Sequence, residues 1–184
     1  MSVVVVTPPE PGIDLELVKA HLRVEHDDDD ALIQAFVDAA VSHIDGPHGL
    51  LNRAVWPQTL ELRQNVFCGP IRLPYGPVSA VTSIKYVDPD GTEQTLSTDD
   101  YLLTNDGQVA LASGASWPPL RGDAEGVRIR YEAGFETVPA AVFTAVCLIV
   151  AHWYANREAV AAGSMSDVPI SATALLRPYR IITV

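Results

Sequence analysis

The stretch "AVTSIKYVDPDGTEQTL", residues 80–96, alternates apolar and polar side chains on either side of a turn sequence. Alternation with a period of two is typical of a strand that buries one face, and Asp88-Pro89-Asp90-Gly91 is a strong turn signal between two such strands. The stretch therefore predicts a β-hairpin.

The same alternation extends outward from the hairpin in both directions. The segment "TLELRQNV" (59–66) alternates leucines with charged residues, and "QVAL" (108–111) and "GVRIRYEAG" (126–134) have the same period. Prolines interrupt the region between these segments, so its connections should be irregular. Residues 55–135 are thus predicted to form a small antiparallel β-sheet.

Helical spacing replaces this pattern at both ends of the chain. Asp14 can cap a short helix that begins at Leu15, and apolar residues then recur with a period near 3.6 through 25–46. A third run, 138–163, starts with Pro139, which suits the first turn of a helix. These runs predict two N-terminal helices and a long C-terminal helix.

We therefore predict an α+β fold with a mainly helical core. The core is expected to consist of helices within 14–46 and 138–162, with 55–135 as a β insertion. The remaining residues, 164–184, are expected to form an extended tail with one helical turn near 172–176, which Pro178 ends. Residues 1–184 are predicted to form a single domain, since 184 residues suffice for one buried core.

The charge balance argues against nucleic-acid binding. The chain has 12 basic and 23 acidic residues, a net charge of −11. A DNA-binding surface needs clustered basic groups to neutralise phosphates, so this chain should repel DNA or let it pass without specific binding.

Other features limit the location of the protein. Cys68 and Cys147 have no second cysteine at metal-ligand or redox spacing, so we expect two free thiols, which suits a reducing cytoplasm. The N-terminus lacks the basic and apolar regions of a signal peptide. The most apolar run, 138–151, is about 14 residues long where a membrane span needs roughly 20. We expect no membrane insertion.

A metal site is the main alternative for the acidic run. Asp27–Asp30 lies close to His21 and His26, and carboxylates with imidazoles are common metal ligands, as a metal-dependent hydrolase would require. Four consecutive residues at a helix start point around the helix, however, and acidic residues are favoured there by the helix dipole. Helix capping is the preferred interpretation, and no metal or cofactor is expected.

No catalytic motif supports an enzyme. The chain contains no GxSxG nucleophile turn and no phosphate-binding glycine loop. His152 and Glu158 are six positions apart, whereas a zinc-binding helix presents ligands four apart. We predict that the protein is not an enzyme.

Several strings, in their order and spacing, resemble one known family. They are "LELVKAHLRVEHDDDDALIQAFVDAA", "WPQTLELR", "IRLPYGPVSAVTSIKYVDPDGTEQTL", "DDYLL", "VRIRYEAGF" and "LIVAHWYANREAV", which together span most of residues 10–180. The chain is similar to the head–tail connector, or neck adaptor, proteins of tailed bacteriophages and gene transfer agents.

This resemblance implies a structural subunit made in the host bacterial cytoplasm and located in the virion neck. Family members assemble as a ring, usually of twelve copies, under the portal protein, extend the DNA channel and contact a stopper or tail-completion protein. A different neck component, such as a stopper or head-closure protein, remains the alternative within this class.

The resemblance also suggests contact residues. The C-terminal segment of the family commonly reaches the portal, which here corresponds to 170–184, with apolar anchors and two arginines that could meet acidic groups. The candidate portal-binding residues are Leu175, Leu176, Arg177, Tyr179 and Arg180.

Two further pairs are candidates for other contacts. Trp153 and Tyr154 point about 100° apart on a helix, so one is expected in the core and the other at a subunit interface, with both in the core as the alternative. Asp88 and Asp90, in the predicted hairpin turn, are the candidate acidic residues that face the DNA channel.

Overall fold

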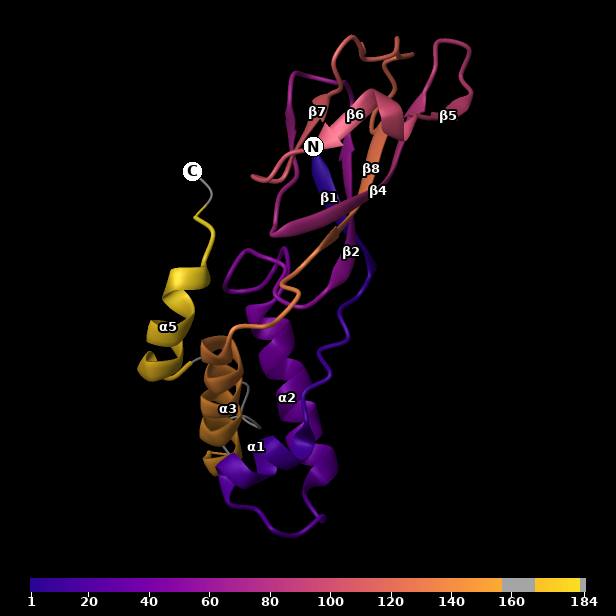
Figure 1. Ribbon diagram of the computed structural model, residues 1–184. Coiled ribbons are helices and arrows are strands. Elements are labelled where there is room, and N and C mark those ends of the chain that lie inside the picture. Colours follow the sequence, from indigo (N-terminus) through magenta and orange to yellow (C-terminus); the bar gives the residue numbers. More distant parts are fainter. Residues whose placement is uncertain (157–167, 183–184) are drawn as a thin grey trace. The chain divides into compact units, whose positions relative to one another are not determined.

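The computed structural model describes residues 1–156 and 168–182 (Figure 1). The chain divides into two compact units. The strand unit comprises Met1–Glu10 and Ala54–Glu136, and the helical unit comprises Pro11–Arg53 and Thr137–Val184. Whether the two act as a single domain stays a prediction.

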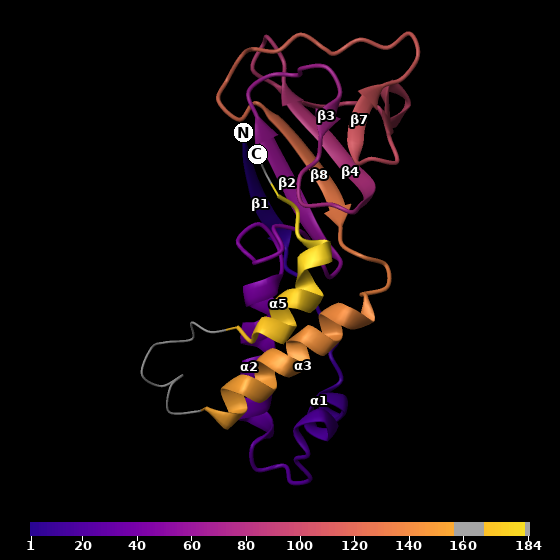
Figure 2. The ribbon, with the colours of Figure 1, turned by 90° about the vertical axis from the view of Figure 1, so that its left-hand side faces the viewer.

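The strand unit contains two antiparallel sheets (Figures 1 and 2). The larger has five strands in the order β1 (Ser2–Thr7), β2 (Gln58–Gln64), β8 (Val127–Ala133), β4 (Val78–Val87) and β5 (Glu93–Thr95). The smaller has three in the order β3 (Ile71–Arg72), β7 (Gln108–Leu111) and β6 (Tyr101–Leu103), with a 3₁₀ turn, η1 (Thr98–Asp100), before β6.

One apolar core lies between these sheets. Strand alternation places Leu62 beside Ile129 and Ile129 beside Ile84 on the inner face of the larger sheet. Ile71 and Val109 of the smaller sheet belong to the same buried cluster. Burying such side chains is the main favourable contribution to folding, at about 1.5–3 kcal/mol for each large one before conformational entropy is subtracted.

The predicted hairpin is confirmed. Strands β4 and β5 pair with Lys85 opposite Thr95, and the N–H of Asp88 donates to the Thr92 carbonyl across the turn. Gly91 has a φ of 86°, a left-handed conformation that glycine adopts at little cost.

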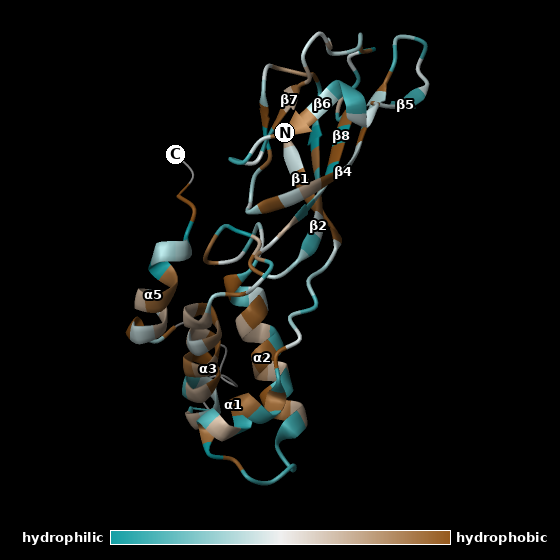
Figure 3. Ribbon diagram, viewed as in Figure 1, coloured by the Kyte–Doolittle hydropathy of each residue, from teal (hydrophilic) through white to brown (hydrophobic). Residues whose placement is uncertain are grey.

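The helical unit is built around one helix. Its elements are α1 (Leu15–Leu22), α2 (Asp30–Ile44), α3 (Ala140–Ala155), α5 (Ile170–Leu176) and a 3₁₀ turn, η2 (Arg177–Tyr179). Helix α3 contacts α1, α2 and α5, so apolar residues occur around most of its circumference (Figure 3). Its buried residues are Val142, Ala145, Val146, Cys147, Ile149, Val150 and Trp153.

The beginnings of α1 and α3 follow the sequence signals, whereas the predicted capping by the acidic run is not seen, because the Asp29 side chain at the N-cap of α2 forms no capping hydrogen bond. Asp14 caps α1 as predicted, since its carboxylate accepts a hydrogen bond of 3.0 Å from the N–H of Glu16. Pro139 precedes the first residue of α3. The predicted continuation of α3 to residue 162 lies outside the described residues beyond 156.

The prediction of a mainly helical core is wrong. The structure is α+β with about 30% helix and 26% strand, and its strands form two sheets. Strand β1 was not predicted because "SVVVVT" lacks alternation, and two strands of the smaller sheet, β3 and β6, have only two and three residues. The helical turn predicted near 172–176 is present as part of helix α5, but the segment is not an extended tail, since α5 packs on α3 and buries Ala172 and Leu176.

Candidate functional site

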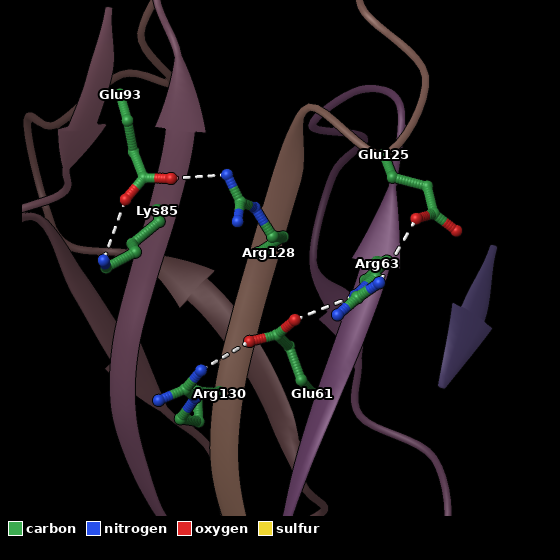
Figure 4. Close-up of polar contacts among 7 residues, drawn as sticks. All are labelled: Glu61, Arg63, Lys85, Glu93, Glu125, Arg128 and Arg130. Carbon is green, nitrogen blue, oxygen red and sulfur yellow. Dashed lines mark hydrogen bonds and ion pairs between the residues drawn. The ribbon is translucent and has the colours of Figure 1, made fainter. Parts of the chain in front are cut away.

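Charged side chains form a network on the outer face of the five-stranded sheet (Figure 4). Those on β2, β4 and β8 alternate with the buried core residues, so the same period that fills the core places them on the opposite face. The other two acids lie on β5 and in the loop before β8. We call this network the charged ladder, and its members are Glu61, Arg63, Lys85, Glu93, Glu125, Arg128 and Arg130.

Glu61 is the most enclosed member of the charged ladder. Its side chain is 7% exposed and accepts hydrogen bonds of 2.8 Å from Arg63 Nε and 2.9 Å from Arg130 Nη2. Burial alone raises the pKa of Glu61, but the hydrogen bonds from the two arginines outweigh burial and bring that pKa below its usual value. Glu61 is therefore a carboxylate held in its charged form.

A second acid, Glu93, bridges two other cations. It accepts a hydrogen bond of 2.8 Å from Lys85 Nζ and forms an ion pair with Arg128. The hydrogen bond from Lys85 is the largest cause of the lowered pKa of Glu93. Each acid of the ladder is thus paired with at least one basic side chain, an arrangement that cross-links neighbouring strands.

The predicted portal-binding residues lie at the end of α5 and in η2. Leu176 is buried, Leu175 and Tyr179 are partly buried, and Arg177 and Arg180 are exposed. Leu176 therefore anchors the segment to the helical unit, while Arg177 and Arg180 are exposed to solvent.

Backbone contacts fix the segment that follows η2. The N–H of Ile181 donates to the Leu51 carbonyl over 2.9 Å, and Asn52 Nδ2 donates to the Ile181 carbonyl over 3.4 Å. A pocket of about 660 Å³ lies beside this contact, within the helical unit, and is lined in part by His43, His48 and Arg180.

The candidate interface pair lies at the end of α3. Trp153 is 2% exposed and its ring lies 6.3 Å from that of Phe36, centroid to centroid. Tyr154 is partly exposed, and its hydroxyl donates to the Asp29 carboxylate. Trp153 is thus a core residue of the helical unit, and Tyr154 is the member of the pair with an exposed part.

The two candidate channel residues have different roles in the hairpin. Asp88 accepts hydrogen bonds of 3.0 Å from Gln94 Nε2 and 2.8 Å from the Thr92 N–H, which lower its pKa. Asp90 is exposed at the tip of the turn. Asp88 shapes the turn, whereas Asp90 can be changed without disturbing these bonds.

The acidic run holds a lysine. Lys19, whose side chain is 4% exposed, lies 2.6 Å from Asp27 Oδ1 and 2.8 Å from Asp30 Oδ1. The hydrogen bonds that Lys19 donates to the carboxylates of Asp27 and Asp30 raise the pKa of Lys19. The ammonium group occupies the position between carboxylates that the metal alternative requires, and residues 1–156 and 168–182 contain no group of three or more His, Cys, Asp or Glu side chains that could hold a metal ion.

The structure also shows the environment of the two cysteines and the length of the apolar helices. Cys68 is exposed and Cys147 is buried, and both are free thiols. Among the described residues, no helix is long and apolar enough to cross a membrane.

Comparison with known proteins identifies the family of the chain. The sequence profile described as Head completion protein matches residues 13–182, which is nearly the whole chain. The chain belongs to the head completion protein family. No curated protein matches it.

Solved structures of neck proteins are similar to this head completion protein. A chain in "Neck of empty GTA particle computed with C6 symmetry" is 27% identical with a TM-score of 0.75, where GTA denotes a gene transfer agent. Chains in "Virion of native gene transfer agent (GTA) particle" and "Neck of native GTA particle computed with C12 symmetry" are 25% and 26% identical, with TM-scores of 0.74 and 0.71. Each match covers 100% of this chain and 97% of the other.

These findings confirm the predicted resemblance to head–tail connectors. They also confirm the predicted structural role of this head completion protein in joining a head to a tail. The matches extend over both compact units, so the whole chain, and not one unit alone, has the fold of the neck proteins.

Two surfaces of this head completion protein are not evident from its sequence alone. The charged residues of "TLELR" and "VRIRYE" were recognised only as the polar side of strands, although their alternation already placed them on one face. The loop 46–53 that holds Ile181 carried no recognisable sequence signal, because the contact joins residues more than 100 positions apart.

Proposed function

We propose that this head completion protein is a ring-forming adaptor in the neck of a tailed phage or gene transfer agent particle. Its location in the virion neck follows the family and the similar neck chains. The observation that carries the proposal is the match over 100% of the chain to a neck chain solved with C12 symmetry. Twelve copies would then surround the DNA channel.

The ring would bind the portal protein through the C-terminal segment. Exposed Arg177 and Arg180 can form ion pairs with acidic portal groups, while Leu175 offers a partly buried apolar contact beside them. Buried Leu176 would hold this surface on the helical unit. Many copies of a weak contact add to a stable junction because the ring presents them together.

The channel surface of such a ring should not hold DNA. A net charge of −11 repels the phosphate backbone, and four of the 12 basic residues are already paired with acids in the charged ladder. We assign exposed Asp90, with Asp88 behind it, to the channel. A stopper or tail-completion protein would bind the tail-proximal side.

The proposed role is structural and without catalysis. The acids of the ladder are neutralised, and Lys19 lies between the carboxylates of the acidic run. This supports an assembly protein over a hydrolase.

Co-sedimentation with heads tests the proposal. Purified protein is mixed with portal-containing, tailless heads, and bound copies per head are counted after sedimentation, with heads lacking portal as the control. The proposal predicts a fixed number of copies per portal vertex near twelve and none on the control heads. A subunit that stays monomeric by light scattering and binds neither kind of head would refute it.

A further inference from the structure

A ring with more than two copies needs two different contact surfaces on each subunit. In a cyclic assembly, one surface of each copy meets a different surface of the next, and the pair must be complementary. We therefore compared the exposed edges of the strand unit, since an unpaired strand edge presents backbone N–H and C=O groups ready to bind another chain.

Of the four terminal strands of the two sheets, two have exposed apolar side chains. Among the described strands, the large apolar side chains that are exposed belong to β1 (Val4, Val5 and Val6, each 39–40%) and β6 (Leu102, 46%). Neither strand contains a charged residue. The other two edges are polar, because β5 carries Glu93 of the charged ladder and β3 has only two residues, one of them exposed Arg72.

The outer sides of β1 and β6 have free backbone groups. Each strand terminates its sheet, and alternate residues of a terminal strand direct N–H and C=O away from the single neighbour. Within residues 1–156 and 168–182, the backbone of Ser2–Thr7 bonds to β2 and that of Tyr101–Leu103 to β7, with no backbone bond on the outer sides.

The β1 edge lacks most of the features by which proteins protect a terminal strand. Edge strands are usually blocked by charge, proline or shortness, and β1 instead has four consecutive valines and only a register shift between Val5 and Thr7. Such an edge aggregates unless it is covered. This edge is therefore a candidate contact surface between copies of the chain.

The two apolar edges lie where a head-to-tail contact needs them. Figure 2 shows β1 at one side of the strand unit and β7, the neighbour of β6, at the other, with β2, β8 and β4 between them. Since β6 pairs with β7, the two apolar edges belong to different sides of the strand unit, which allows each copy to bind a copy on either side.

We propose that the outer edge of β1 in one copy pairs with the outer edge of β6 in the next copy. This inference rests on the proposed ring. The five-stranded sheet of each subunit then continues into the three-stranded sheet of its neighbour, and Val4 and Leu102 become buried between subunits. The three residues of β6 limit the pairing to a short ladder, so a single contact is weak and closure of the ring stabilises it.

Paired cysteines test the contact in assembled rings. Cys68 is exposed and is replaced by serine, while buried Cys147 is kept, since burial raises the pKa of its thiol and slows its reaction. Val4→Cys and Leu102→Cys are introduced singly and together, and head-bound rings are treated with a short flexible bis-maleimide. The double variant should give a ladder of covalent oligomers, and each single variant should stay monomeric in denaturing gels.

A second cysteine pair, outside the proposed contact, is the control for the cross-linking experiment. Val66 is 50% exposed but lies in the loop after β2, so Val66→Cys with Leu102→Cys should give no ladder. Dimers from Val4→Cys alone would show that β1 pairs with itself and would overturn the proposal. If rings of the double variant assemble on heads but give no ladder, the proposed β1–β6 contact is wrong and the proposed function is unaffected. If the unmodified protein forms no ring at all, both the contact and the proposed function are wrong.

Introducing a charged side chain on either terminal strand tests the contact independently. Val4→Lys and Leu102→Lys should each raise the protein concentration at half-assembly by about tenfold or more, because one lysine on a terminal strand blocks pairing. Val66→Lys should leave it unchanged. Unaltered thermal unfolding of all three variants separates lost assembly from lost folding, and normal assembly of Val4→Lys would contradict the proposed edge.

Discussion

Glu61 and Arg130 lie directly opposite each other on β2 and β8, and their side chains form a hydrogen bond of 2.9 Å. Arg63, two residues along β2, binds the other oxygen of the same carboxylate at 2.8 Å. One carboxylate thus connects two arginines on adjacent strands of a protein that is otherwise strongly acidic.

Replacing Glu61 with glutamine should lower the free energy of unfolding by about 1–2 kcal/mol, because one enclosed acid is lost while both partly exposed arginines remain. Urea denaturation followed by circular dichroism measures this. Glu132→Gln is the matched control, since Glu132 is an exposed acid on β8. Equal stability of the two variants would show that the ladder does not stabilise the fold.

The pH dependence of stability should follow the same carboxylate. The pKa of Glu61 is lowered in the folded state, so its contribution is complete above the ordinary glutamate pKa, 4.5, and is lost as pH falls through the lower folded value. Unfolding measured from pH 6 down to pH 3 should therefore show a smaller loss of stability in Glu61→Gln than in the unmodified protein. Parallel curves would contradict the assignment.

Secondary structure could be predicted from the sequence where apolar and polar residues alternate. It could not be predicted where strands are short or pair with strands far away in the sequence. The hairpin at 80–96 and the helices after Asp14 and Pro139 follow local signals, and the structure contains them. Strand β1 has no alternation because it lies at a sheet edge, where both faces of the strand are partly exposed, and its partner β2 is more than 50 residues away. No local pattern could specify that pairing.

The sequence alone could not decide which of the candidate contact residues are buried and which are exposed. Trp153 and Tyr154 are adjacent, and the helical angle predicted different environments without deciding which residue lies inside. Tertiary contact with Phe36 buries Trp153, and the Asp29 carboxylate binds Tyr154. Leu176 looked like an exposed anchor because nothing local indicates that α5 packs on α3.

Replacing Lys19 with methionine should lower the melting temperature of the protein, whereas Lys85→Met should have little effect. Methionine preserves the apolar stem of lysine but leaves the carboxylates of Asp27 and Asp30 without their cation. Lys85 is the only other lysine, and its side chain is 46% exposed. Differential scanning calorimetry compares the two, and equal melting temperatures would contradict a stabilising role for the buried ammonium.

Replacing Leu176 with alanine should cost about 2–5 kcal/mol of unfolding free energy, because its side chain is 1% exposed and leaves a cavity against the helical core. Leu175→Ala, at a partly buried position, should cost well below that. Chemical denaturation separates the two variants. A small effect of Leu176→Ala would indicate that α5 detaches readily from α3.

This packing determines how portal binding should be tested. Deletion of 170–184 would expose the face of α3 that α5 covers, so loss of function would be ambiguous. Arg177→Glu with Arg180→Glu changes only exposed charges, and we expect it to reduce co-sedimentation with portal-containing heads at least tenfold with an unchanged melting temperature. Exposed Arg23→Glu, in the helical unit but outside the C-terminal segment, is the control, and equal binding by both variants would exclude this surface from the portal contact.

Replacing Asp90 with arginine should slow DNA passage through the neck without unfolding the hairpin. The side chain is exposed at the turn tip, and twelve copies would place a ring of positive charge where the proposed channel requires repulsion. Asp88 cannot serve in this test, because it accepts hydrogen bonds from Thr92 and Gln94 that maintain the turn. The rate of DNA release from assembled particles, followed with an intercalating dye, should fall and should recover at high salt as phosphate contacts are screened. Asp28→Arg, an equal charge change at an exposed position of the helical unit, should release DNA at the normal rate. If Asp90→Arg also releases DNA normally at low salt, the hairpin turn does not face the channel.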